Sequence, residues 1–206
     1  MAEELRGQAR RGAERREAII DAAITVFAER GYRAGALADV AEKVDLSPAG
    51  ILYHFGSKEE LLLEVIAERD RRAGEVMVAH PDRQGVEALR DTVRFAEQSE
   101  DERGLVALHS VLQAESLEPD AVTHEYFLQR SRFLRGLIAH TLRTAQDLGE
   151  IRTDVDCSAK ANEVVAFLEG AALVWLVDPE LSLVELYRNY FDDLVDALAP
   201  TPGATS

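Results

Sequence analysis

The side chains best suited to binding chemistry lie in residues 47–58, which read SPAGILYHFGSK. An Ala-Gly pair inside this segment allows another molecule to come close to the backbone, and Tyr53, His54 and Lys58 supply hydrogen-bond donors. Such donors suit the phosphates and base edges of a nucleic acid. The segment therefore indicates contact with DNA.

Two short helices are needed to position these side chains. The first is expected over about Leu37–Val44, with its apolar residues on one face, and the second over Pro48–His54. Ser47 is a good N-cap, and the proline after it suits the first helical position. Ile51 and Phe55 are four residues apart and can face a core. This pattern is typical of a helix-turn-helix, whose second helix enters the major groove of DNA.

The flanking segments complete the arrangement. A helix is predicted from about Glu14 to Arg30, and Gly31 ends it as a C-terminal cap residue would. A longer helix is predicted from Lys58 to about Val78. The free N–H groups at its start, together with Lys58, form a plausible clamp for a phosphate.

The rest of the chain also has the periodicity of helices, and no stretch shows convincing period-two alternation. Further helices are predicted over 83–99, 102–116, 121–148, 159–177 and 183–198. The expected fold class is all-α, with about nine helices. We expect a helix-turn-helix domain over 1–58, a helical ligand-binding and dimerisation domain over 59–199, and a disordered tail over 200–206.

The net charge of −15 is unevenly distributed. Residues 1–58 carry nine Lys/Arg and nine Asp/Glu, so the whole net charge lies in residues 59–206. An acidic body can orient the neutral end toward DNA, or it can simply aid solubility. The arginines near the N-terminus, including Arg15 and Arg16, are either a mobile arm that reaches DNA or a solvated tail.

The segment from residue 14 to 61 resembles the TetR/AcrR family of transcriptional regulators. The resemblance is carried by Phe27-Ala-Glu-Arg-Gly31-Tyr32, by Asp39-Val40-Ala41, and by Leu46-Ser47 followed by Leu52–Leu61. It implies a ligand-responsive regulator, most often a repressor, that binds a palindromic operator as a dimer and is released by a small molecule. The residues expected to contact DNA are Ser47, Pro48, Ala49, Gly50, Leu52, Tyr53, His54, Lys58, Arg15 and Arg16.

Several positions depart from the family pattern. Gly35 and Ala36 stand where a Thr or Ser commonly caps the first short helix, and Asp45 stands where the turn usually has Gly. Gly50 replaces a polar residue, and Leu52 replaces a tyrosine that usually contacts a phosphate. These departures leave open an alternative, a helical protein-interaction dimer that has lost sequence-specific DNA binding.

The last two helices are the expected dimer interface. Each has apolar residues on much of its circumference, and a helix that is apolar on two sides needs two partners. The family usually dimerises through these helices as a four-helix bundle, which implies a homodimer here. The residues expected at the interface are Val165, Ala172, Leu183, Tyr187, Phe191, Leu194 and Val195.

The resemblance also implies a pocket among the middle helices. Its lining is mostly apolar, so we expect a mainly hydrophobic effector with one or two polar groups. Arg130, if it is buried, needs an acid, either a protein carboxylate or an anionic ligand. The residues expected at the pocket are Phe95, His109, Leu112, Gln113, Phe127, Arg130, Phe133, Leu134, Leu137, Glu163, Phe167 and Trp175.

Other classes of protein lack their sequence signals. The chain has no Gly-rich phosphate loop and no G-x-S-x-G or H-E-x-x-H motif, so we expect no enzymatic activity and no cofactor. Five scattered His and a single Cys give no metal-ligand spacing. No signal peptide and no membrane span are recognised, which together with the lone Cys157 predicts a cytoplasmic protein.

Overall fold

The computed structural model describes residues 2–78 and 82–200, and this part of the chain contains helices and no strand. The all-α prediction is therefore confirmed for the described residues. The ten helical segments are α1 (Ala2–Ala34), α2 (Leu37–Lys43), α3 (Pro48–Phe55), α4 (Lys58–Val78), α5 (Gly85–Arg90), α6 (Thr92–Asp101), α7 (Arg103–Glu115), α8 (His124–Asp147), α9 (Cys157–Val177) and α10 (Leu183–Leu198). Apart from Pro200, the predicted disordered tail lies outside the described residues.

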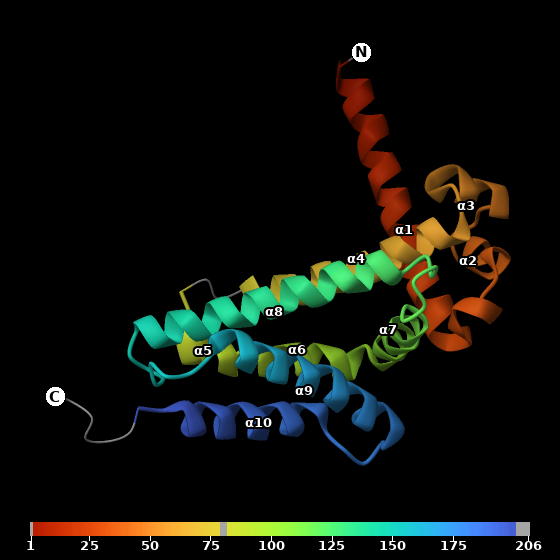
Figure 1. The fold of residues 1–206 in the computed structure, drawn as a ribbon. Coiled ribbons are helices and arrows are strands. Elements are labelled where there is room, and N and C mark those ends of the chain that lie inside the picture. The colour runs from red at the N-terminus through yellow and green to blue at the C-terminus, as the bar shows by residue number, and fades with distance from the viewer. Residues whose placement is uncertain (1, 79–81, 201–206) are drawn as a thin grey trace.

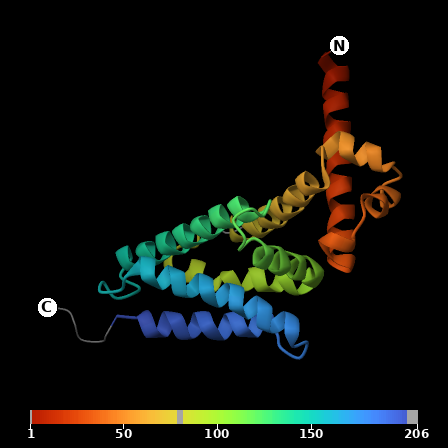
Figure 2. The ribbon, with the colours of Figure 1, turned by 45° about the vertical axis from the view of Figure 1, so that its right-hand side comes forward.

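The helices form a small group at one end and a larger layered group at the other (Figure 1). Helices α2 and α3 lie beside α1, whose first turns project away from the rest of the molecule (Figures 1 and 2). Helix α4 leads from this end into the larger group, where α9 lies between α8 and α10 (Figure 2). The C-terminal end of α10 lies at the opposite end of the molecule from α3 (Figure 1).

The N-terminal helices share one apolar core with the beginning of α4. Val26 and Phe27 of α1 pack there with Ile51 and Phe55 of α3, all at most 3 % exposed. Helix α7 also contributes to this core, through leucines on one face. The same helix approaches α1 closely at Gly104, where an added Cβ would lie 2.8 Å from the Cβ of Ala28.

A second apolar core joins helices α5 to α10. Arg103, at the start of α7, fixes one corner of it. Its Nη2 donates to the carbonyl oxygens of Trp175 and Leu176 at 3.1 and 2.9 Å, and its guanidinium lies 4.4 Å from the centre of the Trp175 ring. A cation at the C-terminal end of α9 also stabilises the helix dipole.

Two elements differ from the sequence-based prediction. Helix α1 begins at Ala2 rather than near Glu14, because the added segment is rich in strong helix formers and contains an Arg10–Glu14 ion pair at 3.5 Å. The predicted helix over 83–99 is interrupted at Asp91, since α5 packs mainly on α8 and α6 mainly on α10. Within the described ranges, no helix combines the length and apolar character needed to cross a membrane.

Candidate nucleic-acid interface

Helix α3 is fixed at its N-terminus as the sequence predicted. Ser47 Oγ accepts a hydrogen bond from the backbone N–H of Gly50 at 3.1 Å, and Pro48 occupies the first helical position. The preceding turn passes through Asp45, whose φ of 54° lies in the left-handed region that favours glycine. Asparagine and aspartate tolerate this region better than most other side chains do, so the departure from glycine is accommodated.

The start of α2 uses a different cap from the usual hydroxyl. The carboxylate of Asp39 accepts a hydrogen bond from the backbone N–H of Ala36 at 3.0 Å and pairs with Arg30 at 2.7 Å. The backbone hydrogen bond, followed by the nearby guanidinium, lowers the pKa of Asp39. A Cβ on Gly35 would lie 2.9 Å from the ring of Phe27, so packing against α1 requires a glycine there.

One face of α3 is open to solvent. Tyr53 is 87 % exposed and Leu52 is 39 % exposed, while Gly50 and His54 are half-buried. A Cβ on Gly50 would meet its nearest neighbours at 3.6 Å, so the fold itself does not require a glycine at this position. The helix therefore presents an aromatic hydroxyl and a nearly bare stretch of backbone on the side away from the core.

Lys58 is not directed toward an incoming phosphate as predicted. Its Nζ donates to the carbonyl oxygen of Tyr32 at 2.6 Å and lies 4.5 Å from the centre of the Tyr32 ring. The Tyr32 hydroxyl in turn donates to Glu59 at 3.2 Å, and burial followed by the charge of Glu59 raises the pKa of Tyr32 to about 12. In this structure Lys58 joins α4 to the end of α1. The first turn of α4 is capped by Ser57 Oγ, which accepts from the N–H of Glu60.

Arg15 and Arg16 also contact helix ends of the chain itself rather than forming a free arm. Arg15 donates to the carbonyl oxygen of Val44 at 3.1 Å, at the end of α2, and Arg16 donates to that of His54 at 3.0 Å, at the end of α3. The Arg16 guanidinium lies 4.3 Å from the centre of the Phe55 ring and also pairs with a carboxylate of α4. Both arginines neutralise helix C-termini, which stabilises the packing of α1 against the helix pair.

Further exposed cations lie on the first turns of α1, at Arg6, Arg10 and Arg11. Arg10 and Arg11 belong to the N-terminal arginines for which the sequence left two roles open, an arm that reaches DNA or a solvated tail. Their helical setting was hidden because surface helices without an apolar face give no periodic signal.

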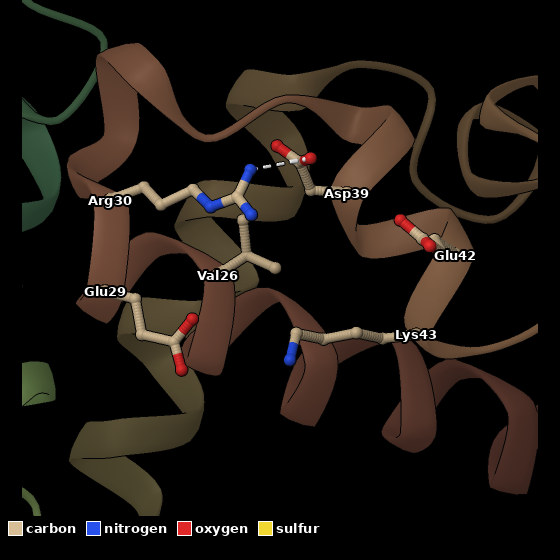
Figure 3. Close-up of a pocket in the computed structure, with 6 residues that line it drawn as sticks. All are labelled: Val26, Glu29, Arg30, Asp39, Glu42 and Lys43. Carbon is tan, nitrogen blue, oxygen red and sulfur yellow. Dashed lines mark ion pairs between the residues drawn. The ribbon is translucent and has the colours of Figure 1, made fainter.

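A shallow hollow of about 300 Å³ lies between α1 and α2. Its side chains include the Arg30–Asp39 ion pair, with Glu29 and Lys43 directed toward the same space (Figure 3). Three carboxylates and two cations line it, so its charge does not favour a phosphate.

The residues predicted for an effector pocket separate into three groups. His109, Leu112, Phe127 and Trp175 are buried, and Phe95, Gln113, Arg130, Leu134, Leu137 and Phe167 are half-buried. Phe133 is 69 % exposed on α8, and Glu163 is exposed on α9, where it pairs with Lys160. Phe133 and Glu163 therefore do not line the core, because both lie on outward faces of their helices.

The structure gathers ionisable residues around Arg130 that the sequence did not connect. Arg130 Nε donates to both carboxylate oxygens of Asp70 at 3.1 Å, and Nη1 donates to Glu169 at 2.9 Å. Tyr126 donates to the same Asp70, and Arg69 lies beside it. The predicted need of Arg130 for an acid is met by two carboxylates, from α4 and α9. We call Arg69, Asp70, His109, Tyr126, Arg130 and Glu169 the ionic cluster.

Six of the seven residues predicted for a dimer interface are buried inside one chain. Val165, Leu183, Tyr187, Phe191, Leu194 and Val195 belong to the described core, and only Ala172 is half-buried. Their apolar stripes are covered by the chain's own helices, so a second copy cannot reach them in this structure. The exposed apolar residues of α9 instead include Ala166, Leu173, Val174 and Val177, besides Ala159 near its start.

Helix α3 is exposed on one face and packs with α1 and α2 on the other. This is the arrangement of a helix-turn-helix DNA-binding protein. Residues 19–65 match the family of bacterial regulatory proteins described as tetR, and residues 87–200 match the C-terminal region of BetI-type transcriptional repressors. The chain belongs to the TetR family and is a DNA-binding transcriptional regulator.

Individual relatives agree with this assignment. The chain is 26% identical over 156 residues to the HTH-type transcriptional repressor AcnR of Corynebacterium diphtheriae, covering 76% of this chain and 78% of that protein. A TetR-family regulator from Rhodococcus sp. matches at 26% identity with a TM-score of 0.76, over 91% of this chain and 100% of that one. A transcriptional regulator from Saccharomonospora viridis, solved in complex with choline, matches at 26% identity with a TM-score of 0.77, over 92% and 100%.

Proposed function

We propose that the chain is a repressor that binds a palindromic operator as a homodimer and is released by a small, mainly hydrophobic effector. The observation that carries the proposal is the open face of α3, where Tyr53 is 87 % exposed on a helix capped by Ser47 and packed on its other side. A helix of this kind can lie in the major groove while the supporting helices keep its orientation.

The contacts to DNA follow from what α3 and α1 expose. Tyr53 and His54 donate to phosphates or base edges, and Leu52 meets a thymine methyl group. The bare backbone at Ala49 and Gly50 allows the helix to approach closely. Arg6, Arg10 and Arg11 on the projecting turns of α1 add contacts to phosphates.

The proposed homodimer uses the outward side of α9. Ala166, Leu173, Val174 and Val177 are exposed at helical spacing, and Val177 is 85 % exposed. Residues three and four apart lie on the same side of a helix, so these side chains form one stripe. A two-fold axis through that stripe would place two α3 helices on successive turns of DNA, about 34–36 Å apart.

Release by an effector requires a connection between the C-terminal core and α3. Helix α4 provides it, since Lys58 at its start contacts Tyr32 and Asp70 further along contacts Arg130 of α8. A ligand that changes the packing around Asp70 changes the position of α4, and with it the orientation of α3. A coupling free energy of about 1–3 kcal/mol corresponds to a 5- to 150-fold change in DNA affinity.

Choline is one candidate effector, because a structural neighbour binds it. The ionic cluster does not favour a quaternary ammonium, because its two carboxylates, Asp70 and Glu169, are already paired with Arg130. A quaternary ammonium would find no unpaired carboxylate there.

Fluorescence anisotropy with DNA from the promoter region next to the gene tests DNA binding. We expect tight binding with a steep dependence on salt, and a loss of at least tenfold in affinity for Tyr53→Ala. Phe133→Ala removes another exposed aromatic ring, far from α3 in sequence, and should leave the affinity unchanged. Failure to bind any neighbouring palindrome would instead favour the protein-interaction dimer that has lost DNA binding.

Analytical ultracentrifugation tests the homodimer. Val177→Glu should shift the wild-type dimer toward monomer, because it places a charge in the proposed apolar stripe. Leu117→Glu changes an equally open apolar side chain outside α9 and should leave the dimer intact. A dimer that persists in Val177→Glu and in Leu173→Glu would contradict this interface.

A further inference from the structure

Arg69 of α4 is a buried cation with few partners. It is 6 % exposed, and the one hydrogen bond that the described residues give it runs from Nη1 to Asp70 Oδ1 at 3.2 Å. A guanidinium has five N–H donors, which usually find acceptors when they are buried. Most of the donor capacity of Arg69 is therefore not used by the described residues.

The neighbouring carboxylates have few free hydrogen-bond acceptor positions for Arg69. Asp70 accepts two hydrogen bonds from Arg130 and one from Tyr126, besides the one from Arg69. These four contacts use about all of the acceptor positions of a carboxylate. Glu169 is engaged by Arg130, and no hydrogen bond between Glu169 and Arg69 is present among the described residues.

His109 of α7 is a second buried side chain whose hydrogen-bonding capacity is not fully used within the described residues. It is 3 % exposed, and its Nε2 has no hydrogen-bond partner within the described part of the chain. Burial first, and then the charges of Arg69 and Arg130, lower its pKa well below the usual value. The imidazole is therefore neutral, and in one of its two tautomers Nε2 carries a proton that it can donate.

The surroundings of these donors are aromatic. The Arg69 guanidinium lies 5.5 Å from the centre of the Phe95 ring, and the His109 ring lies 5.0 Å from that of Phe127. Phe167 and Tyr187 pack nearby, with ring centres 5.8 Å apart. A molecule that reaches Arg69 and His109 would thus place one polar end between them and the remainder against apolar side chains.

We propose that Arg69 and His109 bind the carboxylate of an otherwise apolar effector. This inference rests on the proposed effector-released repressor and names the chemical class of its ligand. A carboxylate supplies acceptors only, which matches the unused donors of a guanidinium and an imidazole. The carboxylate pairs with Arg69 in the bidentate geometry that guanidinium groups favour.

The position of Arg69 connects binding to α4. The residue lies in the middle of the helix that begins at Lys58, while His109 lies on α7. A carboxylate held by both residues fixes the distance between these two helices. Since α3 leads directly into α4, an anion that shifts α4 would act on the DNA-binding end.

Three probes that share an eight-carbon chain test the charge of the head group. They are octanoate, octanamide and octyltrimethylammonium, and the measurement is the Tm of the full chain. We expect octanoate to raise Tm by roughly 5–10 °C at one hundred times its Kd. The neutral amide and the cation should have much smaller effects. Equal shifts for octanoate and octanamide, a larger shift for the cation, or no shift for octanoate would overturn the proposal.

Variants assign the effect to these residues. Arg69→Met and His109→Phe should each reduce the octanoate shift at least by half. Arg103→Met is the matched control, because it removes another guanidinium that lies on an aromatic ring but donates to helix carbonyls. An octanoate shift that survives in both Arg69→Met and His109→Phe contradicts the site. If one variant does not fold, the other still gives the result.

DNA anisotropy separates this inference from the proposed function. Tight operator binding without any octanoate effect on Tm would overturn the carboxylate site and leave the regulator in place. An octanoate shift that depends on Arg69, with unchanged affinity for DNA, would support the site and contradict release by this class of effector.

Discussion

Cations are used differently at the two ends of α4. At the N-terminal end, Arg15, Arg16 and Lys58 donate to backbone carbonyl oxygens, each at 3.1 Å or less. In the C-terminal core, Arg69 and Arg130 lie beside carboxylates from α4 and α9. The first group completes the structure of helix ends. The second group holds charge in an apolar region, where every unmatched donor is costly.

This difference indicates that the groups a cation donates to, rather than the number of cations, distinguish a structural role from a binding role. Arg15, Arg16 and Lys58 already donate to carbonyl oxygens within the chain, although their sequence positions suggested DNA contacts. Arg69, which drew no attention in the sequence, has unused donors in the core.

The largest expected effect comes from breaking the ionic cluster. Arg130→Met removes the cation that joins Asp70 to Glu169, so Glu169 loses its guanidinium partner and Asp70 keeps only Arg69 and Tyr126. We expect the free energy of unfolding to fall by about 3–5 kcal/mol, measured by urea denaturation. The matched change Arg90→Met, in an exposed pair with Asp192, should cost at most about 1 kcal/mol. Equal losses in the two variants would mean that burial adds nothing to the cluster.

An intermediate effect is expected from pH. Because the folded chain lowers the pKa of His109, protons bind more readily to the unfolded chain. The contribution of His109 to stability is complete above pH 6.5 and is lost as the pH falls below that value, by at most about 1.4 kcal/mol per pH unit. His109→Phe should therefore flatten the pH dependence of unfolding between pH 6.5 and 5.

The exposed His140 provides the control for this experiment. His140→Phe should leave the pH dependence of the wild type in place. A slope that is unchanged in His109→Phe would show that His109 does not remain neutral in the folded chain.

The smallest effects sharpen the description of the DNA-binding end. Arg16→Met should lower the free energy of unfolding by roughly 1–2 kcal/mol, because it removes a charged donor from the His54 carbonyl. The salt dependence of DNA binding should stay the same, since Arg16 is not proposed to contact phosphate. A reduced salt slope for Arg16→Met would return that residue to the DNA contacts.

Tyr53→Phe should change stability by less than about 0.5 kcal/mol and still weaken DNA binding.

Local patterns predicted the helix-turn-helix in detail. Ser47, Pro48 and the apolar positions Ile51 and Phe55 act over a few residues, so sequence spacing alone identifies their roles. The ionic cluster was not predictable in this way. Asp70 and Arg130 are sixty residues apart, and only the packing of α4 against α8 brings them together.

The sequence also did not show which apolar side of a helix faces the core of its own chain. Helix α9 has apolar residues around most of its circumference, so its sequence does not show which side the chain itself covers. Tyr187 and Phe191 of α10 were expected to meet a second copy, and the structure places both in the monomer core. The sequence likewise did not show that α1 extends back to Ala2 and carries Arg6 and Arg10.

The contact at Gly104 has a consequence for how α3 can move. Because the backbone of α7 at Gly104 directly faces the methyl group of Ala28 of α1, the two helices cannot come closer at that point. We expect a change in the spacing of α4 and α7 to rotate α1, α2 and α3 about this contact. Gly104 would thus be the pivot of this rotation, which a shift of α4 would start and which would move Tyr53 on α3.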